Sequence, residues 1–200
     1  MENSGELEQE PPIGTHIPIT PKTLMDEPLS SLDAKLRADL RVELKRVQAD
    51  LGATMLYVTH DQIEAMTMAT HIGVLDQGRL VQFGSPRDIY ESPETLYVAT
   101  RLGQPRINTL PADLFGRAPD GASVIALRPE NILQGQGTEA RVVRVERLGD
   151  QTRLHLKLAG HDIVTVTDPH TALGVGDALA IAPHNPLYFD TAGVRVAVKG

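Results

Sequence analysis

The segment LMDEPLSSLDAKLRADLRVELKRVQADLGATMLYVTHD, residues 24–61, decides the fold of the first half of the chain. Its apolar start predicts a strand that ends in two adjacent carboxylates, Asp26 and Glu27. The run TMLYV, residues 54–58, predicts a second buried strand, and His60 lies just beyond its end. If the strands are parallel, these side chains lie at the same carboxyl edge, where open α/β sheets bind ligands.

Between the two strands, apolar residues recur every three or four positions, which predicts one face of an amphipathic helix. These residues are Leu36, Leu40, Leu44, Val47 and Leu51. Asp33 or Ser31 is placed to cap the start of this helix, and Gly52 is placed to cap its end. A second helix is expected over residues 61–69, followed by a strand hairpin over residues 72–83. Alternating strands and helices indicate an α/β layer with some parallel pairing.

The rest of the chain changes in character near residue 103. Two short helices are expected over residues 85–102, each starting at a Ser-Pro pair. Residues 103–121 are rich in Gly, Pro and Asn, which is typical of a linker. Short strand-like runs separated by turn residues follow, and they predict a small β-barrel or sandwich. These runs cover residues 124–127, 140–145, 152–158, 163–166 and 178–182.

Composition excludes several classes of function. The 200 residues contain no Cys, so disulfides, thiolate metal sites and Cys nucleophiles are excluded. The net charge of -7, the absence of Trp and an aromatic content of 4% argue against a nucleic-acid partner. No apolar run reaches the roughly 18 residues of a membrane span. Residues 1–21 are acidic and rich in Pro, which predicts a disordered leader rather than a secretory signal.

The residue types at the predicted sheet edge suit phosphate chemistry. One carboxylate of the pair Asp26 and Glu27 can hold Mg²⁺ through water, while the other orients an attacking water. The imidazole of His60 can donate a hydrogen bond to a phosphate oxygen. Each motif alone is also explained by a charged turn or a surface histidine. Their coincidence at the ends of two successive strands favours a site.

With these residues in place, the segment from LMDEPLSSLD to the hairpin resembles the second half of an ABC-transporter ATPase. It is similar to the ATP-binding subunits of carbohydrate importers of the maltose and glycerol-phosphate type, and the resemblance extends over residues 21–200. It implies that Asp26 ends the Walker B strand and binds Mg²⁺, that Glu27 is the catalytic carboxylate, and that His60 is the switch histidine at the γ-phosphate. Ser31 and Asp33 match the D-loop, which lies across the ATPase dimer in that family.

The second half supports the same resemblance. IALRPE, residues 125–130, resembles the motif that opens the TOBE domain of sugar-importer ATPases, and Leu148-Gly149 fits a later stretch of that domain. The implied architecture is an incomplete P-loop-NTPase (RecA-like) α/β layer over residues 22–102, the linker 103–121, and an OB-like barrel over residues 122–200. In that family the barrel mediates dimer contacts and regulation.

The sequence also departs from the family pattern. No G-x-x-x-x-G-K-[ST] P-loop, LSGGQ-like signature or Q-loop occurs in these 200 residues. The P-loop supplies the amides and the Lys that hold the β- and γ-phosphates. We therefore expect no tight Mg-ATP binding and no ATP hydrolysis from this chain alone.

The resulting prediction is a fragment of the energy-coupling, ATP-binding subunit of an ABC importer for a sugar-type solute. The resemblance implies a peripheral location at the inner face of the cell membrane, with permease subunits and a second ATPase subunit as partners and a homodimer as the assembly. Two alternatives stay open, namely a non-catalytic regulatory or dimerisation module and a small oxyanion-binding barrel. Nucleotide binding separates the first alternative from an active ATPase, and anion titration tests the second.

Overall fold

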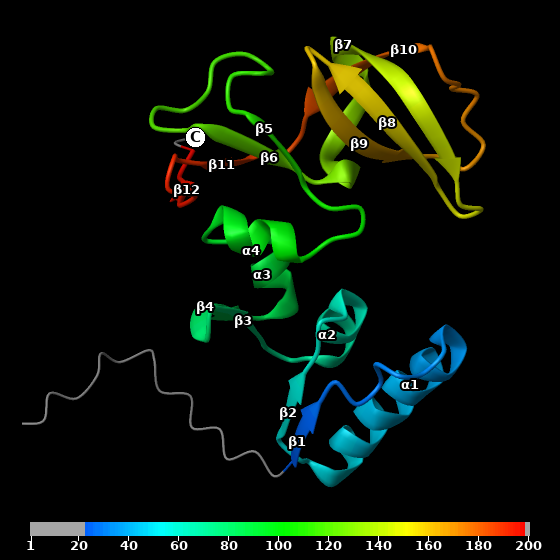
Figure 1. Ribbon diagram of the computed structural model, residues 1–200, viewed down its shortest axis with the longest axis vertical. Coiled ribbons are helices and arrows are strands. Elements are labelled where there is room, and N and C mark those ends of the chain that lie inside the picture. Colours follow the sequence, from blue (N-terminus) through cyan, green and yellow to red (C-terminus); the bar gives the residue numbers. More distant parts are fainter. Residues whose placement is uncertain (1–22, 199–200) are drawn as a thin grey trace, which may run out of the picture. The chain divides into compact units, whose positions relative to one another are not determined.

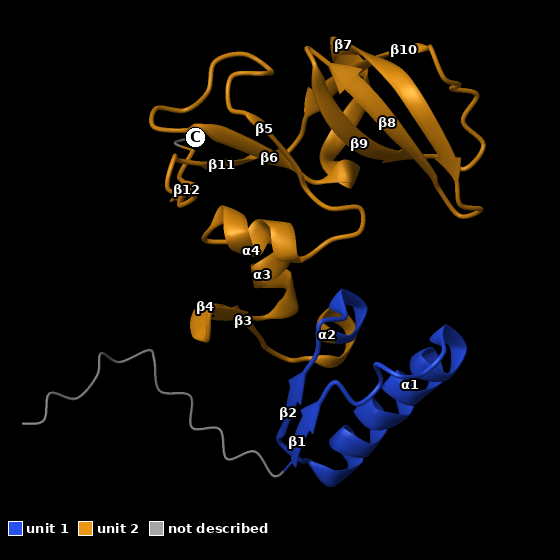
Figure 2. Ribbon diagram, viewed as in Figure 1, with its two compact units in different colours: residues 1–64 blue, residues 65–200 orange. Residues whose placement is uncertain are grey.

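The computed structural model describes residues 23–198, so the leader predicted over residues 1–21 lies outside the described part. Figure 1 traces the elements along the chain, and Figure 2 divides it into two compact units. The first unit reaches Glu64 and the second begins at Ala65, within helix α2 (Gln62–Met68).

The first unit is built on a strand–helix–strand unit. Its elements are β1 (Thr23–Asp26), α1 (Ala34–Leu51) and β2 (Met55–Val58). β1 and β2 pair in parallel, with Thr23 opposite Met55 and Asp26 opposite Val58. This confirms the parallel pairing expected from the sequence and brings the carboxyl ends of both strands to one edge.

Helix α1 begins and ends where its capping residues place it. The Asp33 side chain accepts a hydrogen bond of 2.9 Å from the backbone N–H of Leu36. Gly52 ends the helix at φ 56°, a left-handed conformation that glycine adopts without steric penalty. The predicted apolar face remains accessible, since no α1 residue is buried and Leu51 is 68% exposed.

The second unit opens with a hairpin and two short helices. They are β3 (Ile72–Asp76), β4 (Arg79–Gly84), α3 (Pro86–Glu91) and α4 (Leu96–Arg101). Ser85 and Asp88 form a reciprocal capping box at the start of α3, as the Ser-Pro pair there predicted. α4 starts later than expected, because the Thr95 side chain, rather than Ser92, caps it by accepting from the Val98 N–H.

Two four-stranded antiparallel sheets form the remainder of the second unit. One has the order β10-β7-β8-β9 and the other the order β12-β11-β6-β5. Their elements are β5 (Asn108–Pro111), β6 (Val124–Leu127), the 3-10 helix η1 (Pro129–Asn131), β7 (Ile132–Arg147), β8 (Thr152–Leu158), β9 (His161–Thr167), β10 (Ala178–Pro183), β11 (Leu187–Phe189) and β12 (Arg195–Val196). β5 lies inside the segment that the sequence assigned to a linker, since its pairing with β6 orders residues 108–111.

The expected barrel differs from what is found, because no sheet in residues 23–198 closes on itself. The side chain of Asn108 joins the edge of one sheet to the other. Its Nδ2 donates to the carbonyls of Leu127 (3.0 Å) and Val164 (2.9 Å), and its Oδ1 accepts from the Val164 N–H (2.7 Å). A side-chain amide thus satisfies edge groups of β9 that a neighbouring strand would pair in a closed barrel.

One hydrophobic core nevertheless spans both sheets. Leu110 and Ile125 from the β5–β6 sheet cluster with Leu154, Leu156 and Ile163 from the β8–β9 sheet, and all five are buried. The mixture of helices and strands predicted from the sequence is therefore confirmed. Within residues 23–198, no helix is both long enough and apolar enough to cross a membrane.

Candidate functional site

The carboxyl edge of the β1–β2 pair gathers the side chains singled out in the sequence. The Glu27 N–H donates to the Val58 carbonyl at 2.8 Å, which extends the parallel ladder by one residue past β1. Asp26 is the last residue of β1 and its side chain is exposed. The chain beyond each strand therefore leaves the sheet at the same edge.

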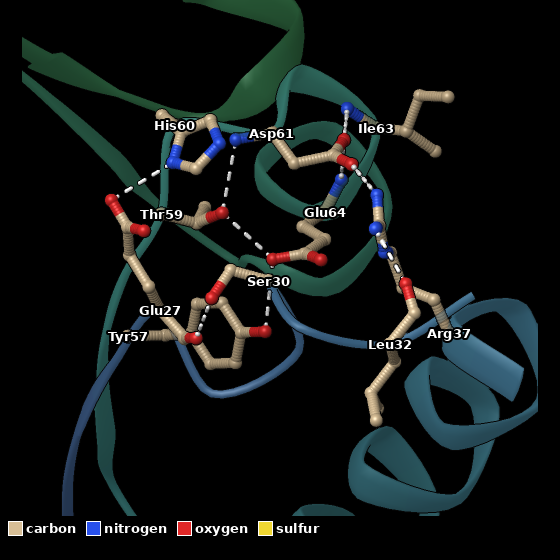
Figure 3. Close-up of polar contacts among 10 residues, drawn as sticks. All are labelled: Glu27, Ser30, Leu32, Arg37, Tyr57, Thr59, His60, Asp61, Ile63 and Glu64. Atoms are coloured by element: carbon tan, nitrogen blue, oxygen red, sulfur yellow. Dashed lines mark hydrogen bonds and ion pairs between the residues drawn. The ribbon is translucent and has the colours of Figure 1, made fainter. Parts of the chain in front are cut away.

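Glu27 and His60 meet directly at this edge (Figure 3). Glu27 Oε1 lies 2.8 Å from His60 Nδ1, although 33 positions separate the residues in the sequence. Both groups are accessible, with 45% of the Glu27 and 73% of the His60 side chain exposed. The hydrogen bond and the charge of Glu27 raise the pKa of His60 above its ordinary value, so the pairing favours the protonated imidazole.

The backbone at Glu27 is held in an unusual conformation. Its φ is 43°, in the left-handed region that non-glycine residues rarely occupy. The turn that follows is fixed because the Ser30 N–H and Oγ both donate to the Glu27 carbonyl, at 3.2 and 2.9 Å. Buried Leu29 anchors the same turn. Strained backbone conformations of this kind cluster at functional sites, where the surrounding contacts enforce them.

Ser31 and Asp33 lie in the connection between this turn and α1. Both are exposed, and Asp33 is engaged as the helix cap described above. Residues 23–198 contain no group of three or more His, Cys, Asp or Glu residues spaced to hold a metal ion. The metal role of Asp26 and the D-loop roles of Ser31 and Asp33 therefore remain predictions.

Two further side chains, Arg37 and Glu64, organise the edge and were not predicted from the sequence (Figure 3). Arg37 on α1 donates to the Leu32 carbonyl at 2.8 Å and contacts the Asp61 carboxylate at 3.3 Å. Glu64, on α2, is 2% exposed and accepts hydrogen bonds from two side chains of the β2 edge. A buried acidic residue in a helix cannot be distinguished from a solvent-facing one by sequence pattern alone.

The IALRPE motif has a different role, inside the second unit. Arg128 is 4% exposed, and its guanidinium lies 3.9 Å from the centre of the Tyr90 ring. It donates to the carbonyls of Tyr90 (3.0 Å), Ala99 (3.2 Å) and Leu102. The Arg128 side chain therefore ties α3 and α4 to the end of β6, and burial lowers the pKa of its guanidinium.

Glu130 of the same motif completes the contact. Tyr90 Oη donates to Glu130 Oε1 at 2.6 Å. Burial, and secondarily this hydrogen bond, raises the pKa of Tyr90 to about 12, so the phenol remains a donor at neutral pH. The motif thus has a structural function in this chain.

Comparisons with known proteins agree with both halves of this description. The TOBE domain family matches residues 125–186, which begin at the IALRPE motif. The sn-glycerol-3-phosphate import ATP-binding protein UgpC 2 of Rhizobium johnstonii is 41% identical over 169 residues, covering 78% of this chain and 49% of the relative. A UgpC protein of a Ruegeria species is 38% identical over 216 aligned residues, covering 97% of this chain and 62% of the relative.

A relative named for a different solute gives a similar result. The xylose/arabinose import ATP-binding protein XacK of Haloferax volcanii is 39% identical over 209 aligned residues, covering 90% of this chain and 55% of the relative. The chain therefore spans about half the length of the curated relatives it matches. Its sequence is therefore similar to part of the ATP-binding proteins named for import of sn-glycerol-3-phosphate and of xylose or arabinose, and its TOBE domain match lies at residues 125–186.

Proposed function

We propose that this chain supplies the hydrolytic side of the ATP site in an energy-coupling subunit of an ABC importer. The observation that carries the proposal is the 2.8 Å contact between Glu27 and His60 at the shared carboxyl edge of β1 and β2. We assign the β1–α1–β2 unit to an incomplete P-loop-NTPase layer, in which this edge faces the nucleotide phosphates. Identity with relatives whose names state ATP binding supports the assignment.

The two paired residues have complementary tasks in hydrolysis. The Glu27 carboxylate is an acceptor that orients the attacking water and receives its proton. The Nδ1 atom of His60 is engaged by Glu27, so Nε2 is the ring atom that donates to a γ-phosphate oxygen. A protonated His60, which the pairing favours, places positive charge where negative charge builds up in the transition state.

Asp26 fits the metal role that the family implies. Its carboxylate is exposed at the end of β1, adjacent in sequence to Glu27, and carboxylate oxygens and waters are the ligands that Mg²⁺ prefers. Mg²⁺ supplies neutralisation of the phosphate charge when it is bound. Ser31 and Asp33 are proposed to lie next to the nucleotide of a second ATPase subunit, as exposed residues of the connection to α1.

The chain does not hold the phosphates unaided in this proposal, because its 200 residues contain no P-loop. Asp26 and Glu27 are adjacent carboxylates with no P-loop Lys to offset their charge, which disfavours a bound ATP tetra-anion. The isolated chain is expected to show no ATP hydrolysis. Hydrolysis by the isolated chain that disappears in Glu27→Gln would show that the phosphates are held in a way not proposed here.

A chimera tests the function positively. The N-terminal part of the Ruegeria relative, up to the position aligned with residue 22, is joined to residues 23–200 of this chain. The proposal predicts that the chimera hydrolyses ATP in the presence of Mg²⁺ while the isolated chain does not. A chimera that is folded, binds ATP and releases no phosphate would refute it.

The second unit supports a regulatory and dimerising role beside the ATPase function. The residues that match the TOBE domain contribute to one continuous buried core, so this unit has a hydrophobic core of its own. We propose that this unit pairs with a second copy and that the assembly binds permease subunits at the inner face of the cell membrane. Sedimentation of the chain over a concentration series should show a dimer, and a strict monomer at high concentration would contradict the pairing.

The transported solute is proposed from the relatives alone. Their names state import of sn-glycerol-3-phosphate and of xylose or arabinose, so a carbohydrate-type solute is the simplest assignment. Growth of a deletion strain on single carbon sources would test it, since loss of growth on such solutes is expected and unchanged growth on all of them would contradict it.

A further inference from the structure

Glu64 is a buried carboxylate that takes no part in the proposed hydrolysis mechanism. Its side chain is 2% exposed, and a single oxygen, Oε2, accepts hydrogen bonds from Thr59 Oγ1 at 2.7 Å and from Tyr57 Oη at 2.9 Å. Burying a carboxylate is costly unless it is well hydrogen-bonded. Both donors belong to β2 or to the residue that directly follows it, so these bonds join α2 to the edge that carries His60.

Thr59 extends this contact to the other side of His60. While its hydroxyl donates to Glu64, the same oxygen accepts from the Asp61 N–H at 3.0 Å. The residues before and after His60 are therefore both fixed by one hydroxyl group (Figure 3).

Asp61 itself is held from two directions. Its Oδ1 accepts from the N–H groups of Ile63 (2.8 Å) and Glu64 (3.2 Å), and its Oδ2 contacts Arg37 at 3.3 Å. Partial burial raises the pKa of Asp61, but the hydrogen bonds from these backbone amides and from Arg37 outweigh it, so the pKa is lowered overall. The residue after His60 thus stays charged and in place at neutral pH.

We propose that Glu64 and Thr59 are positioning residues that fix the segment from Thr59 to Asp61 so that the His60 ring faces Glu27. His60 is itself exposed, and its ring makes its short contact with Glu27 at a turn, so its direction depends on how its backbone is held. A misplacement of about 1 Å in a catalytic group can lower a rate on the order of 100-fold. The consequence for ATP hydrolysis rests on the proposed function, whereas the orientation of His60 can be measured without nucleotide.

The two groups that donate hydrogen bonds to Glu64, the Tyr57 phenol and the Thr59 hydroxyl, do not change protonation in the neutral pH range. Burial, followed by the hydrogen bond to Glu64, raises the pKa of the Tyr57 phenol, which therefore stays protonated. The threonine hydroxyl does not titrate. The groups that face His60 and carry charge are Glu27, Asp61 and Glu64, and of these Glu27 has the largest effect on the pKa of the imidazole.

The cleanest test changes Thr59 without changing any charge. Thr59→Val keeps the shape of the side chain but removes both hydrogen bonds of its hydroxyl, and Thr59→Ser restores them. The titration of His60 is followed by NMR in the 200-residue chain, for each variant with and without Glu27→Gln. Thr54→Val, an exposed Thr just before β2, is the matched control.

In the unmodified chain, Glu27→Gln is expected to lower the pKa of His60. In the Thr59→Val background the same substitution should have less than half of that effect, because His60 no longer faces Glu27. Thr59→Ser and Thr54→Val should behave like the unmodified chain. An undiminished effect of Glu27→Gln in folded Thr59→Val would overturn the proposal.

Glu64 is tested by Gln and Leu substitutions, also scored by the effect of Glu27→Gln. Glu64→Gln can keep one oxygen in the position of Oε2, so Glu27→Gln should still lower the pKa of His60 in this variant. In Glu64→Leu, this coupling between Glu27 and the pKa of His60 should be lost. Full coupling in folded Glu64→Leu overturns the role of Glu64. Because no nucleotide is present, a chimera without ATPase activity refutes the proposed function and leaves this result unaffected.

Discussion

Replacement of Arg128 by Leu removes the side chain that joins β6 to helices α3 and α4. The guanidinium donates to the carbonyls of Tyr90, Ala99 and Leu102 and lies over the Tyr90 ring. Hydrogen bonds from a charged donor contribute about 1.5–3 kcal/mol each, and a partly buried cation–π contact about 1 kcal/mol. Relief from burying a charge offsets several kcal/mol of this sum, so we expect a net destabilisation of about 3 kcal/mol.

The assay is native-state hydrogen exchange at the amides of Leu154 and Leu156, which are fully buried in β8 of the same unit. Arg128→Leu should lower the free energy of opening at these amides by about 3 kcal/mol. Arg128→Lys should lose most of the same amount, because one ammonium group cannot replace the planar fork of donors.

Arg87 provides the control, because its ion pair with Glu91 on α3 is highly exposed. Arg87→Leu should change the opening free energy by less than about 0.5 kcal/mol. A change in Arg128→Leu that is no larger than in Arg87→Leu would refute the structural role of Arg128. Complete recovery in Arg128→Lys would show that charge, rather than geometry, is responsible.

Three further predictions follow from single contacts. Asn108→Ala removes two hydrogen bonds between the sheets, both to Val164, and one to Leu127 within its own sheet, and it should lower the stability of the second unit by about 2–3 kcal/mol, with faster exchange of the Val164 amide; unchanged exchange would contradict this link between the sheets. Asp33→Ala removes the cap of α1 and should lower the stability of the first unit by about 1 kcal/mol in urea unfolding, while Asp39→Ala, within the helix, should not. The pKa of His60 in the folded chain lies above the ordinary 6.5, so protonated His60 stabilises the first unit fully below pH 6.5, and this contribution to the free energy of unfolding is lost as the pH rises through the folded-state pKa. Urea unfolding of the His60→Gln variant at several pH values should lack this pH-dependent loss of stability, and an equal loss in both proteins would contradict the pairing of His60 with Glu27.

Local signals in the sequence were sufficient to predict the helix and strands of the first unit and the residues at the carboxyl edge of its strands. Asp33 and Gly52 cap α1, as their positions predicted, and the strand ends bring Glu27 and His60 together. Such features depend on neighbouring residues and on strand polarity, which can be read from pattern. The start of α4 could not be read this way, because Ser92-Pro93 and Thr95 offer competing caps, and only the structure shows that Thr95 pairs with Val194 and that the Leu96 N–H donates to the Gly193 carbonyl.

The features that were missed depend on contacts between residues far apart in the sequence. Asn108 reaches Val164 across 56 positions, and this contact explains why the sheets meet without closing into a barrel. Arg128 was noticed only as part of a family motif, and its role depends on carbonyls 26 to 38 positions away. Periodicity carries no information on such pairs, because a buried polar residue and an exposed one look alike in sequence.

The central claim is that Glu27 carries out hydrolysis at this edge of the sheet. Its most direct test is single-turnover phosphate release from Mg-ATP by the chimera described above, with and without Glu27→Gln, and with Glu43→Gln on the exposed face of α1 as the matched control. We predict that Glu27→Gln retains ATP binding and lowers the rate of phosphate release on the order of 100-fold or more, while Glu43→Gln leaves it unchanged. Phosphate release by Glu27→Gln at the rate of the unmodified chimera would contradict the account.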